Sequence, residues 1–209
     1  SALPELTNID DKGVKVKEVY SSLMQQIINT LFIDLKRVEP LAKSYLIIVF
    51  STKGDEGKSF VAESLVNKLS RIRKKVLYLY PETSSEHGKY LEKDNPKLIK
   101  HSYAVNDGII DYDGIQDFIK TQEGEPENLD DVSYNVLEIP RLNKYPLPAN
   151  LIEQAHYSLL VVHAAKSWTS ADQFLLKNYL KLAHGKTSVL LNHVAPDLLE
   201  SIYGEIPKR

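Results

Sequence analysis

Apolar positions along this chain follow two periods, and each period predicts one type of element. Unbroken apolar runs, such as Tyr45–Phe50, are typical of strands that are buried on both faces. Apolar residues that recur every three or four positions, as in residues 58–75, predict helices with one buried face. Together the patterns predict helices over 16–36, 58–75, 115–120, 149–155 and 171–183, and strands over 45–50, 76–80, 134–139, 158–163 and 187–191.

The alternation of strands and helices predicts an α/β fold with a doubly wound, mostly parallel sheet. We expect residues 1–15 to form a flexible N-terminal segment and residues 16–209 to form a single domain. Residues 81–131 are polar and rich in turn-forming residues. Ligands of doubly wound sheets bind at the carboxyl ends of the strands. A site is therefore expected where these ends gather, at residues 51–59, 80–82, 138–140 and 192.

The composition narrows the class of protein. The chain has 209 residues, of which 43% are hydrophobic and 26% charged, which suits one soluble domain with a sizeable core. A net charge of −2 predicts no nucleic-acid partner and no general attraction to anionic lipid. The lack of cysteine excludes disulfides and thiolate metal sites, and no apolar run is long enough to predict a membrane span. The missing initiator methionine indicates a processed or excised piece.

A loop of phosphate-binding type follows the first predicted strand. Residues 51–59 read Ser-Thr-Lys-Gly-Asp-Glu-Gly-Lys-Ser and lead into a predicted helix. Backbone N–H groups, the helix N-terminus and a lysine together hold phosphate in such loops. The general pattern Gly-x4-Gly-Lys-Ser/Thr is matched at Gly57, Lys58 and Ser59, whereas Thr52 stands where its first glycine belongs. A simple Gly-rich turn with solvated lysines is the alternative.

A second pattern fits the loop better. Lys53-Gly54-x-x-Gly57-Lys58-Ser59 resembles the deviant Walker A motif of the MinD/ParA class of P-loop NTPases. The resemblance implies that Lys58 contacts the β- and γ-phosphates, that Ser59 binds Mg²⁺, and that Lys53 reaches a nucleotide across a dimer interface. It also implies that the cofactor-binding residues are Lys53, Gly54, Asp55, Glu56, Gly57, Lys58, Ser59 and Phe60. The two loop carboxylates would repel phosphate, so we expect their side chains to lie on the loop surface.

The amino-acid sequences of the loop and of four other segments resemble those of the bacterial tyrosine kinases of capsule and exopolysaccharide synthesis. The first segment is Asp55–Ala62, which reads Asp-Glu-Gly-Lys-Ser-Phe-Val-Ala. The others, in their order along the chain, are Glu18–Met24, Lys74–Glu82, Ala155–Ala164 and Val189–Asn192. Their spacing places Glu138-Ile-Pro140 on the Walker B segment of that family. The resemblance covers Glu18 to Asn192 and implies that Asn192 reads adenine; a turn-forming asparagine is the alternative.

The chain departs from the family at the positions where the family has acidic residues. Tyr80 and Glu82 stand where the family has two aspartates, and Glu138 stands for the Walker B aspartate. A tyrosine phenol is neutral at pH 7, so Tyr80 neither binds Mg²⁺ well nor accepts a proton. The remaining candidates are Glu82, Glu138 and Lys53 as catalytic groups, with Ser59 and Glu138 as metal ligands. Arg141 replaces a proline, Ser21 and Met24 replace two arginines, and Tyr203 stands alone where the family has a tyrosine cluster.

These features lead to one functional interpretation and two alternatives. We expect a cytoplasmic domain that resembles the kinases of polysaccharide export, binds ATP or ADP with Mg²⁺, and acts as a regulatory module with weak or no catalysis. The resemblance implies a membrane-embedded chain-length regulator as partner or parent, a place at the inner face of the plasma membrane, and a homo-oligomer. The alternatives are an active enzyme, either a dimeric MinD/ParA-type ATPase or a protein tyrosine kinase, and a protein-interaction scaffold without nucleotide.

Overall fold

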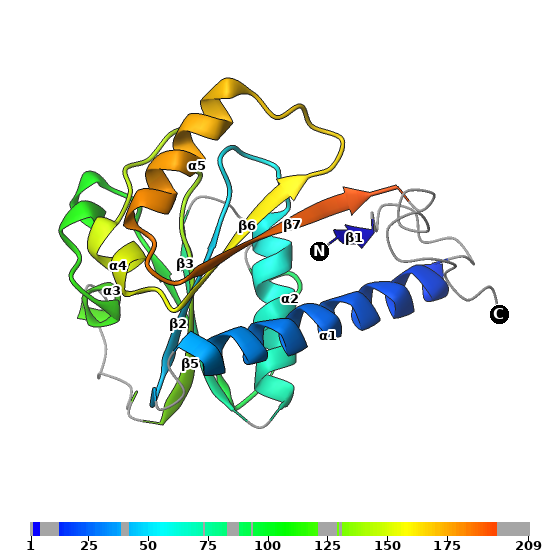
Figure 1. The fold of residues 1–209 in the computed structure, drawn as a ribbon. Coiled ribbons are helices and arrows are strands. Elements are labelled where there is room, and N and C mark those ends of the chain that lie inside the picture. Colours follow the sequence, from blue (N-terminus) through cyan, green and yellow to red (C-terminus); the bar gives the residue numbers. More distant parts are fainter. Residues whose placement is uncertain are drawn as a thin grey trace.

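A parallel β-sheet forms the centre of the computed structural model, which describes residues 2–4, 13–38, 42–72, 74–82, 88–92, 94–120, 129 and 131–195. Within these residues the sheet has seven strands in the order β1-β7-β6-β2-β5-β3-β4 (Figure 1). Every neighbouring pair is parallel. The strands are β1 (Ala2–Pro4), β2 (Tyr45–Phe50), β3 (Lys75–Pro81), β4 (Leu98–Tyr103), β5 (Val132–Glu138), β6 (Tyr157–His163) and β7 (Lys186–Val194).

Helices cover both faces of this sheet, which confirms the predicted doubly wound α/β fold. One face carries α1 (Gly13–Val38) and α2 (Lys58–Arg71). The other carries the 3₁₀ helix η1 (Asp107–Asp111), α3 (Ile115–Lys120), α4 (Ala149–Gln154) and α5 (Ser170–Leu182). Figure 1 shows the two groups on opposite sides of the strands. The described residues contain no helix that is both long and apolar enough to span a bilayer.

Strand β2 lies in the middle of the sheet and shows why an unbroken apolar run folds this way. It pairs with β5 on one side and β6 on the other, so both of its edges are hydrogen-bonded. Ile47 and Val49 pack into the core beneath α1 and α2, while Ile48 and Phe50 pack into the core on the opposite face. Because successive side chains point to opposite faces, a strand between two helical layers needs an apolar residue at every position.

Two edge strands and one short helix were absent from the sequence prediction. Strand β1 lies within the segment expected to be flexible and pairs with β7. Strand β4 and helix η1 lie in the polar stretch 81–131. At the edge of the sheet β4 pairs only with β3 and exposes Lys100, so its sequence lacks the apolar run of an inner strand. Edge strands take their backbone partners from distant segments, which a local pattern does not reveal.

The other element boundaries agree with the prediction to within three residues, apart from the end of the loop helix. That helix was expected to reach Lys75, but α2 ends at Arg71 and Lys75 begins β3. The expected helix over 115–120 and the strand over 45–50 occur with the predicted bounds. The interpretation of Tyr203 concerns a residue outside the described part of the chain.

Candidate functional site

The phosphate-type loop joins β2 to α2, as the sequence predicts. Gly57 caps the N-terminus of α2 with φ of 78°, a left-handed conformation that favours glycine. A side chain there would also meet Asn192, whose amide nitrogen lies 2.0 Å from the position of an added Cβ. No side chain caps the first turn of α2. The helix therefore presents uncapped backbone N–H groups, an arrangement that favours an anion.

Glu138, at the end of β5, lies directly across from the start of α2. Its Oε1 atom accepts hydrogen bonds from Lys58 Nζ and from Ser59 Oγ, the latter over 2.7 Å. Its Oε2 atom accepts one from the Tyr78 hydroxyl over 2.5 Å. The Tyr103 hydroxyl donates to the Glu138 main-chain carbonyl over 2.6 Å. The structure thus brings together Lys58, Ser59 and Glu138 as expected, and adds two tyrosines that the sequence prediction did not include.

The charges in this cluster are set by burial and by the neighbouring cation. Glu138 is fully buried. Burial disfavours its ionised form, but the Lys58 ammonium and the hydrogen bonds from Lys58, Tyr78 and Ser59 outweigh burial and lower the pKa of Glu138 below its ordinary value. Burial and the Glu138 charge raise the pKa of Tyr78 well above its ordinary value. At neutral pH the cluster therefore holds one ammonium, one carboxylate and a protonated phenol.

The extra lysine of the loop is bound within its own chain. Lys53 Nζ donates to Asp172 Oδ2 over 2.9 Å and to the Ser167 carbonyl over 2.7 Å. Thr52 Oγ1 donates to the other carboxylate oxygen of Asp172 over 2.7 Å. Asp172 also forms the capping box of α5 with Thr169. Burial opposes its ionisation, yet the bonds from Thr169, Lys53 and Thr52 hold the pKa of Asp172 far below its ordinary value.

Two further cations lie beside the loop. Lys166, in the turn after β6, donates to the carbonyls of Gly54 and Asp55 over 2.9 and 2.8 Å. The Arg141 side chain lies over Gly54, with one guanidinium nitrogen 2.7 Å from the position of an added Cβ. The side chain of Asp55 is exposed, as expected. Lys53, Lys58, Lys166 and Arg141 therefore surround the loop with positive charge.

Glu56 contradicts the expectation that both loop carboxylates lie on the surface. It is only 2% exposed, and its Oε2 accepts a hydrogen bond from the His163 backbone N–H. Its Oε1 is buried without a hydrogen-bond partner among the described residues. The Glu56 carbonyl accepts from the Asn192 side-chain amide over 3.1 Å. The rings of His163 and His193 stack beside this cluster at 4.4 Å. The ends of β6 and β7 thus hold the loop in place.

The contacts of Asn192 bear on its expected role. The side chain is 1% exposed and its amide nitrogen is bound to the loop carbonyl of Glu56. In this arrangement Asn192 positions the loop, and its contact with adenine stays a prediction. Phe60 likewise packs away from the loop, between the rings of Tyr20 at 5.2 Å and Tyr90 at 4.7 Å.

Glu82, which follows β3, and the tyrosines of β3 have different surroundings. Glu82 is exposed and accepts a hydrogen bond from Ser102 of the edge strand β4 over 2.6 Å. Tyr80 is half-buried with its ring 5.2 Å from that of Tyr78, and burial raises its pKa. Of the two glutamates expected to replace catalytic aspartates, the structure places Glu138 at the loop.

Magnesium is the metal that the sequence resemblance implies, and it requires an octahedral set of oxygen ligands at about 2.1 Å. Ser59 and Glu138 were expected to provide two of these oxygens. Both carboxylate oxygens of Glu138 accept hydrogen bonds, and Lys58 already compensates its charge. Over the described ranges, no three His, Cys, Asp or Glu side chains gather into a metal site. The donor set does not fit a magnesium ion while Lys58 and Tyr78 keep these contacts.

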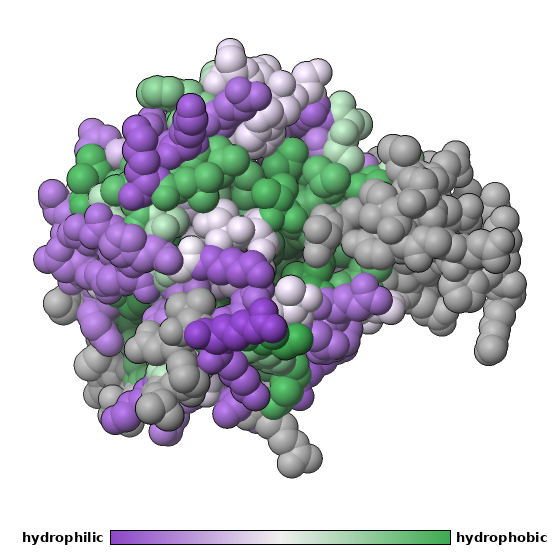
Figure 2. All heavy atoms as spheres, viewed as in Figure 1, coloured by the Kyte–Doolittle hydropathy of each residue, from purple (hydrophilic) through white to green (hydrophobic). Residues whose placement is uncertain are grey.

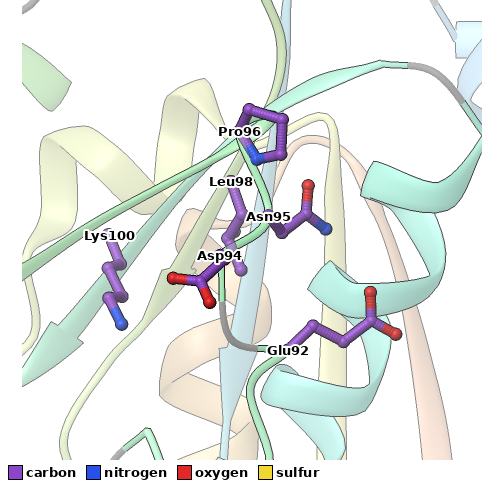
Figure 3. A pocket seen from close by; sticks show the side chains of 6 residues that line it. All are labelled: Glu92, Asp94, Asn95, Pro96, Leu98 and Lys100. Carbon is purple, nitrogen blue, oxygen red and sulfur yellow. The ribbon is translucent and has the colours of Figure 1, made fainter.

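A surface hollow of about 390 Å³ lies elsewhere, beside the start of β4. Figure 3 shows its lining side chains, which carry charges of both signs: Glu92, Asp94, Asn95, Pro96, Leu98 and Lys100. None of these residues belongs to the loop. The hollow therefore lies apart from the candidate phosphate site.

Comparison with known proteins identifies the fold. No protein-family model and no curated protein sequence matches the chain. Among solved structures, the kinase domain of the Escherichia coli tyrosine kinase ETK matches with a TM-score of 0.62 and 11% identity, over 92% of this chain and 87% of that one. The chain has the fold of this kinase domain. The chimerical protein CapA2B2 matches with a TM-score of 0.58 and 11% identity, over 93% of both chains.

The same fold extends to partition proteins. A plasmid partition protein from Borrelia burgdorferi matches with a TM-score of 0.50 and 15% identity, over 77% of this chain and 86% of that one. These matches confirm the predicted fold, which this chain shares with a bacterial tyrosine kinase domain and a plasmid partition protein. At such identities the likeness concerns the kinase-type fold and leaves activity to be argued from the residues of the site.

The sequence prediction missed three residues of the candidate site, namely Tyr78, Lys166 and Asp172. Tyr78 was assigned only to a buried strand, and nothing in its local sequence indicates a bond to Glu138. Lys166 and Asp172 were not singled out at all. The spacing Thr169-x-x-Asp172 is a capping-box signal and could have located the start of α5. It carries no information on the bond from Asp172 to Lys53, because those residues are far apart in the sequence.

Proposed function

We propose that the domain is a nucleotide-binding regulatory module that resembles the polysaccharide tyrosine kinases and does not transfer phosphate. One observation supports this most directly. The lysine and serine of the phosphate-type motif, Lys58 and Ser59, both donate to the acid Glu138, whose two carboxylate oxygens are hydrogen-bonded. The loop is retained, and the groups that would carry out phosphoryl transfer are replaced.

Binding would use the backbone of the loop and the cations around it. The uncapped N-terminus of α2 offers N–H groups to the phosphates of ATP or ADP. Lys58 would turn from Glu138 toward the ligand, and the buried carboxylate would lose its cation while it keeps the hydrogen bonds from Ser59 and Tyr78. Burying a partly compensated charge costs free energy, so the affinity is expected to be weak.

Phosphoryl transfer requires an acceptor for the proton of the attacking hydroxyl and neutralisation of the developing charge. Tyr78 and Tyr80 lie on β3 with raised pKa values, so both are protonated at neutral pH. Glu82 is bound to Ser102 at the sheet edge. Glu138 is ionised but fully enclosed by donors. In these contacts none of Tyr78, Tyr80, Glu82 and Glu138 is poised for the transfer step.

Two assays test this function. Incubation with γ-labelled ATP and Mg²⁺ is expected to give no labelled protein and no released phosphate above the background of a Lys58→Ala variant. Calorimetry with ADP is expected to detect binding to the wild-type chain and none to Lys58→Ala. Robust autophosphorylation that depends on Lys58 would overturn the regulatory assignment and support the active kinase.

We also propose that the module works at the inner face of the plasma membrane, with a membrane-embedded chain-length regulator as partner or parent and with a homo-oligomer as its assembly. The support is the shared kinase-type fold together with the sequence resemblance given above. Co-purification of this chain with such a regulator from detergent extracts is the expected outcome. Purification of the chain free of any membrane protein, at native expression levels, would count against this partner.

A protein-interaction scaffold is the second candidate, and an apolar surface favours it. Large apolar side chains are exposed on α5 and β7, and Phe174 is 64% exposed. The others are Leu180, Val189 and Leu191. Figure 2 shows a broad apolar band on the face that carries these elements. Absence of any calorimetric signal with millimolar ATP or ADP would favour the scaffold over the nucleotide-binding module.

A further inference from the structure

The contacts of Glu138 differ from those that a metal-binding acid needs. A carboxylate that binds Mg²⁺ must offer an oxygen whose charge is not already compensated. In this chain Lys58 and Ser59 donate to Oε1 and Tyr78 donates to Oε2. The residue has no exposed surface through which an ion could be added without displacing one of these donors.

The local charge also gives a dication little attraction. Lys58 and Glu138 cancel each other, and Tyr78 carries no charge. Glu82, the other acid expected near the metal, bonds to Ser102 of β4. In contrast, the rim of the loop carries several cations. Lys166 contacts the loop carbonyls, the Arg141 side chain lies over Gly54, and Lys58 stands at the head of α2.

We propose that this loop binds the phosphates of a nucleotide without Mg²⁺, and that Tyr78 is the positioning residue that keeps Glu138 closed to the ion. The inference rests on the proposed nucleotide-binding function and specifies the form of its ligand. The lysines of the chain neutralise the phosphates in place of the metal. Glu138 acts as an internal anion that competes with the phosphates for Lys58.

Two sets of hydrogen bonds hold Glu138 in place when Lys58 turns toward a ligand. Tyr78 and Ser59 each keep a hydrogen bond to Glu138 when Lys58 turns toward a ligand, so the buried carboxylate is not left without donors. The Tyr103 hydroxyl holds the main chain of Glu138 in the same place. These hydrogen bonds hold the acid in place while the lysine exchanges between its carboxylate and the phosphates.

The first experiment is calorimetry of ADP binding to the wild-type chain in excess EDTA and in excess Mg²⁺. The dissociation constants are expected to agree within about twofold. Binding that is tighter in Mg²⁺ by about tenfold or more would overturn the inference and leave the proposed function standing. Absence of ADP binding in both buffers would overturn the proposed function and the inference together.

The second experiment removes the internal anion. Glu138→Gln is expected to tighten ADP binding in EDTA by about tenfold, because Lys58 no longer has a charged partner in the core. The variant is compared with wild type by circular dichroism to establish that it is folded. An unchanged or weaker affinity of a folded Glu138→Gln protein in EDTA would contradict the competition between Glu138 and phosphate.

The third experiment tests the role of Tyr78 and has a matched control. Tyr78→Phe removes the hydroxyl that donates to Oε2 and is expected to make ADP binding at least about threefold tighter in Mg²⁺ than in EDTA. Tyr179→Phe removes a buried hydroxyl of α5 that bonds to Ser158 and is expected to leave this ratio unchanged. A purely structural role of Tyr78 would alter stability without altering the ratio. Equal ratios in the two variants would therefore overturn the positioning role.

Discussion

The ammonium of Lys53 lies 2.9 Å from Asp172 Oδ2, so the lysine that marks the deviant loop motif is bound within its own chain. Asp172 is a buried residue of α5, and Lys53 is largely shielded from solvent. Together with the bond from Thr52, this pair attaches the first turn of α5 to the phosphate-type loop. The position of the loop is therefore coupled to the start of α5.

Lys53→Ala is expected to lower the free energy of unfolding by about 1–2 kcal/mol, because it removes a charge-assisted hydrogen bond to a buried carboxylate. Asp172→Asn is expected to cost a similar amount, since it also weakens the capping box. Urea unfolding of the two single variants and the double variant gives the coupling energy, which should be about 1 kcal/mol. Strict additivity of the two changes would show that the pair contributes nothing.

The same variant separates an intramolecular role of Lys53 from a role across a dimer. With ADP or ATP present, the sedimentation profile of Lys53→Ala is expected to equal that of the wild-type chain. A wild-type dimer that forms only with nucleotide and is lost in Lys53→Ala would instead support the active MinD/ParA-type ATPase.

Stability is expected to fall in acid. Glu138 and Asp172 have folded-state pKa values below their ordinary values of 4.5 and 3.8. In acid the unfolded chain therefore binds more protons than the folded chain, so the stabilisation is complete above about pH 5 and is lost as pH falls below it. Urea midpoints measured from neutral pH to pH 3 should decrease, and Asp172→Asn should reduce the decrease. Constant midpoints over this range would contradict the two depressed pKa values.

The free energy of unfolding is also expected to fall at high pH. Burial raises the pKa values of Tyr78 and Tyr103 well above the ordinary 10.0. The folded chain keeps these phenol protons where the unfolded chain loses them, so this stabilisation is present below about pH 10 and is lost above it. Tyrosinate absorbance should show a group of phenols that ionise only when the chain unfolds. Titration of all tyrosines near pH 10 in the folded protein would contradict the buried network.

Gly57→Ala is expected to remove ADP binding and to lower the free energy of unfolding by about 2 kcal/mol or more, because it combines a left-handed backbone with a steric conflict. The φ angle is 78° and the Asn192 amide lies 2.0 Å from the new Cβ. Gly114→Ala is the control, since no atom beyond its two neighbours in the chain lies within 4 Å of its Cβ position. Thermal unfolding of the control should stay close to wild type, and equal losses in the two variants would refute the steric argument.

Glu63 of α2 holds the segment that follows β3. Its side chain is fully buried, and its carboxylate oxygens accept the backbone N–H groups of Gly88 and Tyr90 over 2.6 and 2.8 Å. Glu63→Ala is expected to cost about 1–3 kcal/mol, because both N–H groups lose their acceptor. Hydrogen exchange at Gly88 and Tyr90 should accelerate, whereas Glu63→Gln, which keeps one acceptor oxygen, should show a smaller change. Unchanged exchange in Glu63→Ala would contradict this anchoring.

The sequence was sufficient to predict the inner part of the fold. Tyr45–Phe50 and Tyr157–His163 are largely apolar because both of their faces are covered, so a run of consecutive apolar residues reveals their burial. The polar strand β4 and the three-residue strand β1 lie at the edges of the sheet, where β4 pairs with β3 and β1 pairs with β7. Edge pairing depends on distant backbone groups, and no local period encodes it.

By itself, the sequence determined the phosphate-type loop and the alternation of strands and helices, because both depend on residues that are neighbours along the chain. The tertiary structure alone decided the partners of the charged groups. Tyr78, Lys58 and Glu138 come from three different elements, as do Lys53 and Asp172. It also reversed the expectation for Glu56, which lies buried against His163. Parallel strands bring their carboxyl ends to one edge, and only the folded sheet determines which side chains meet there.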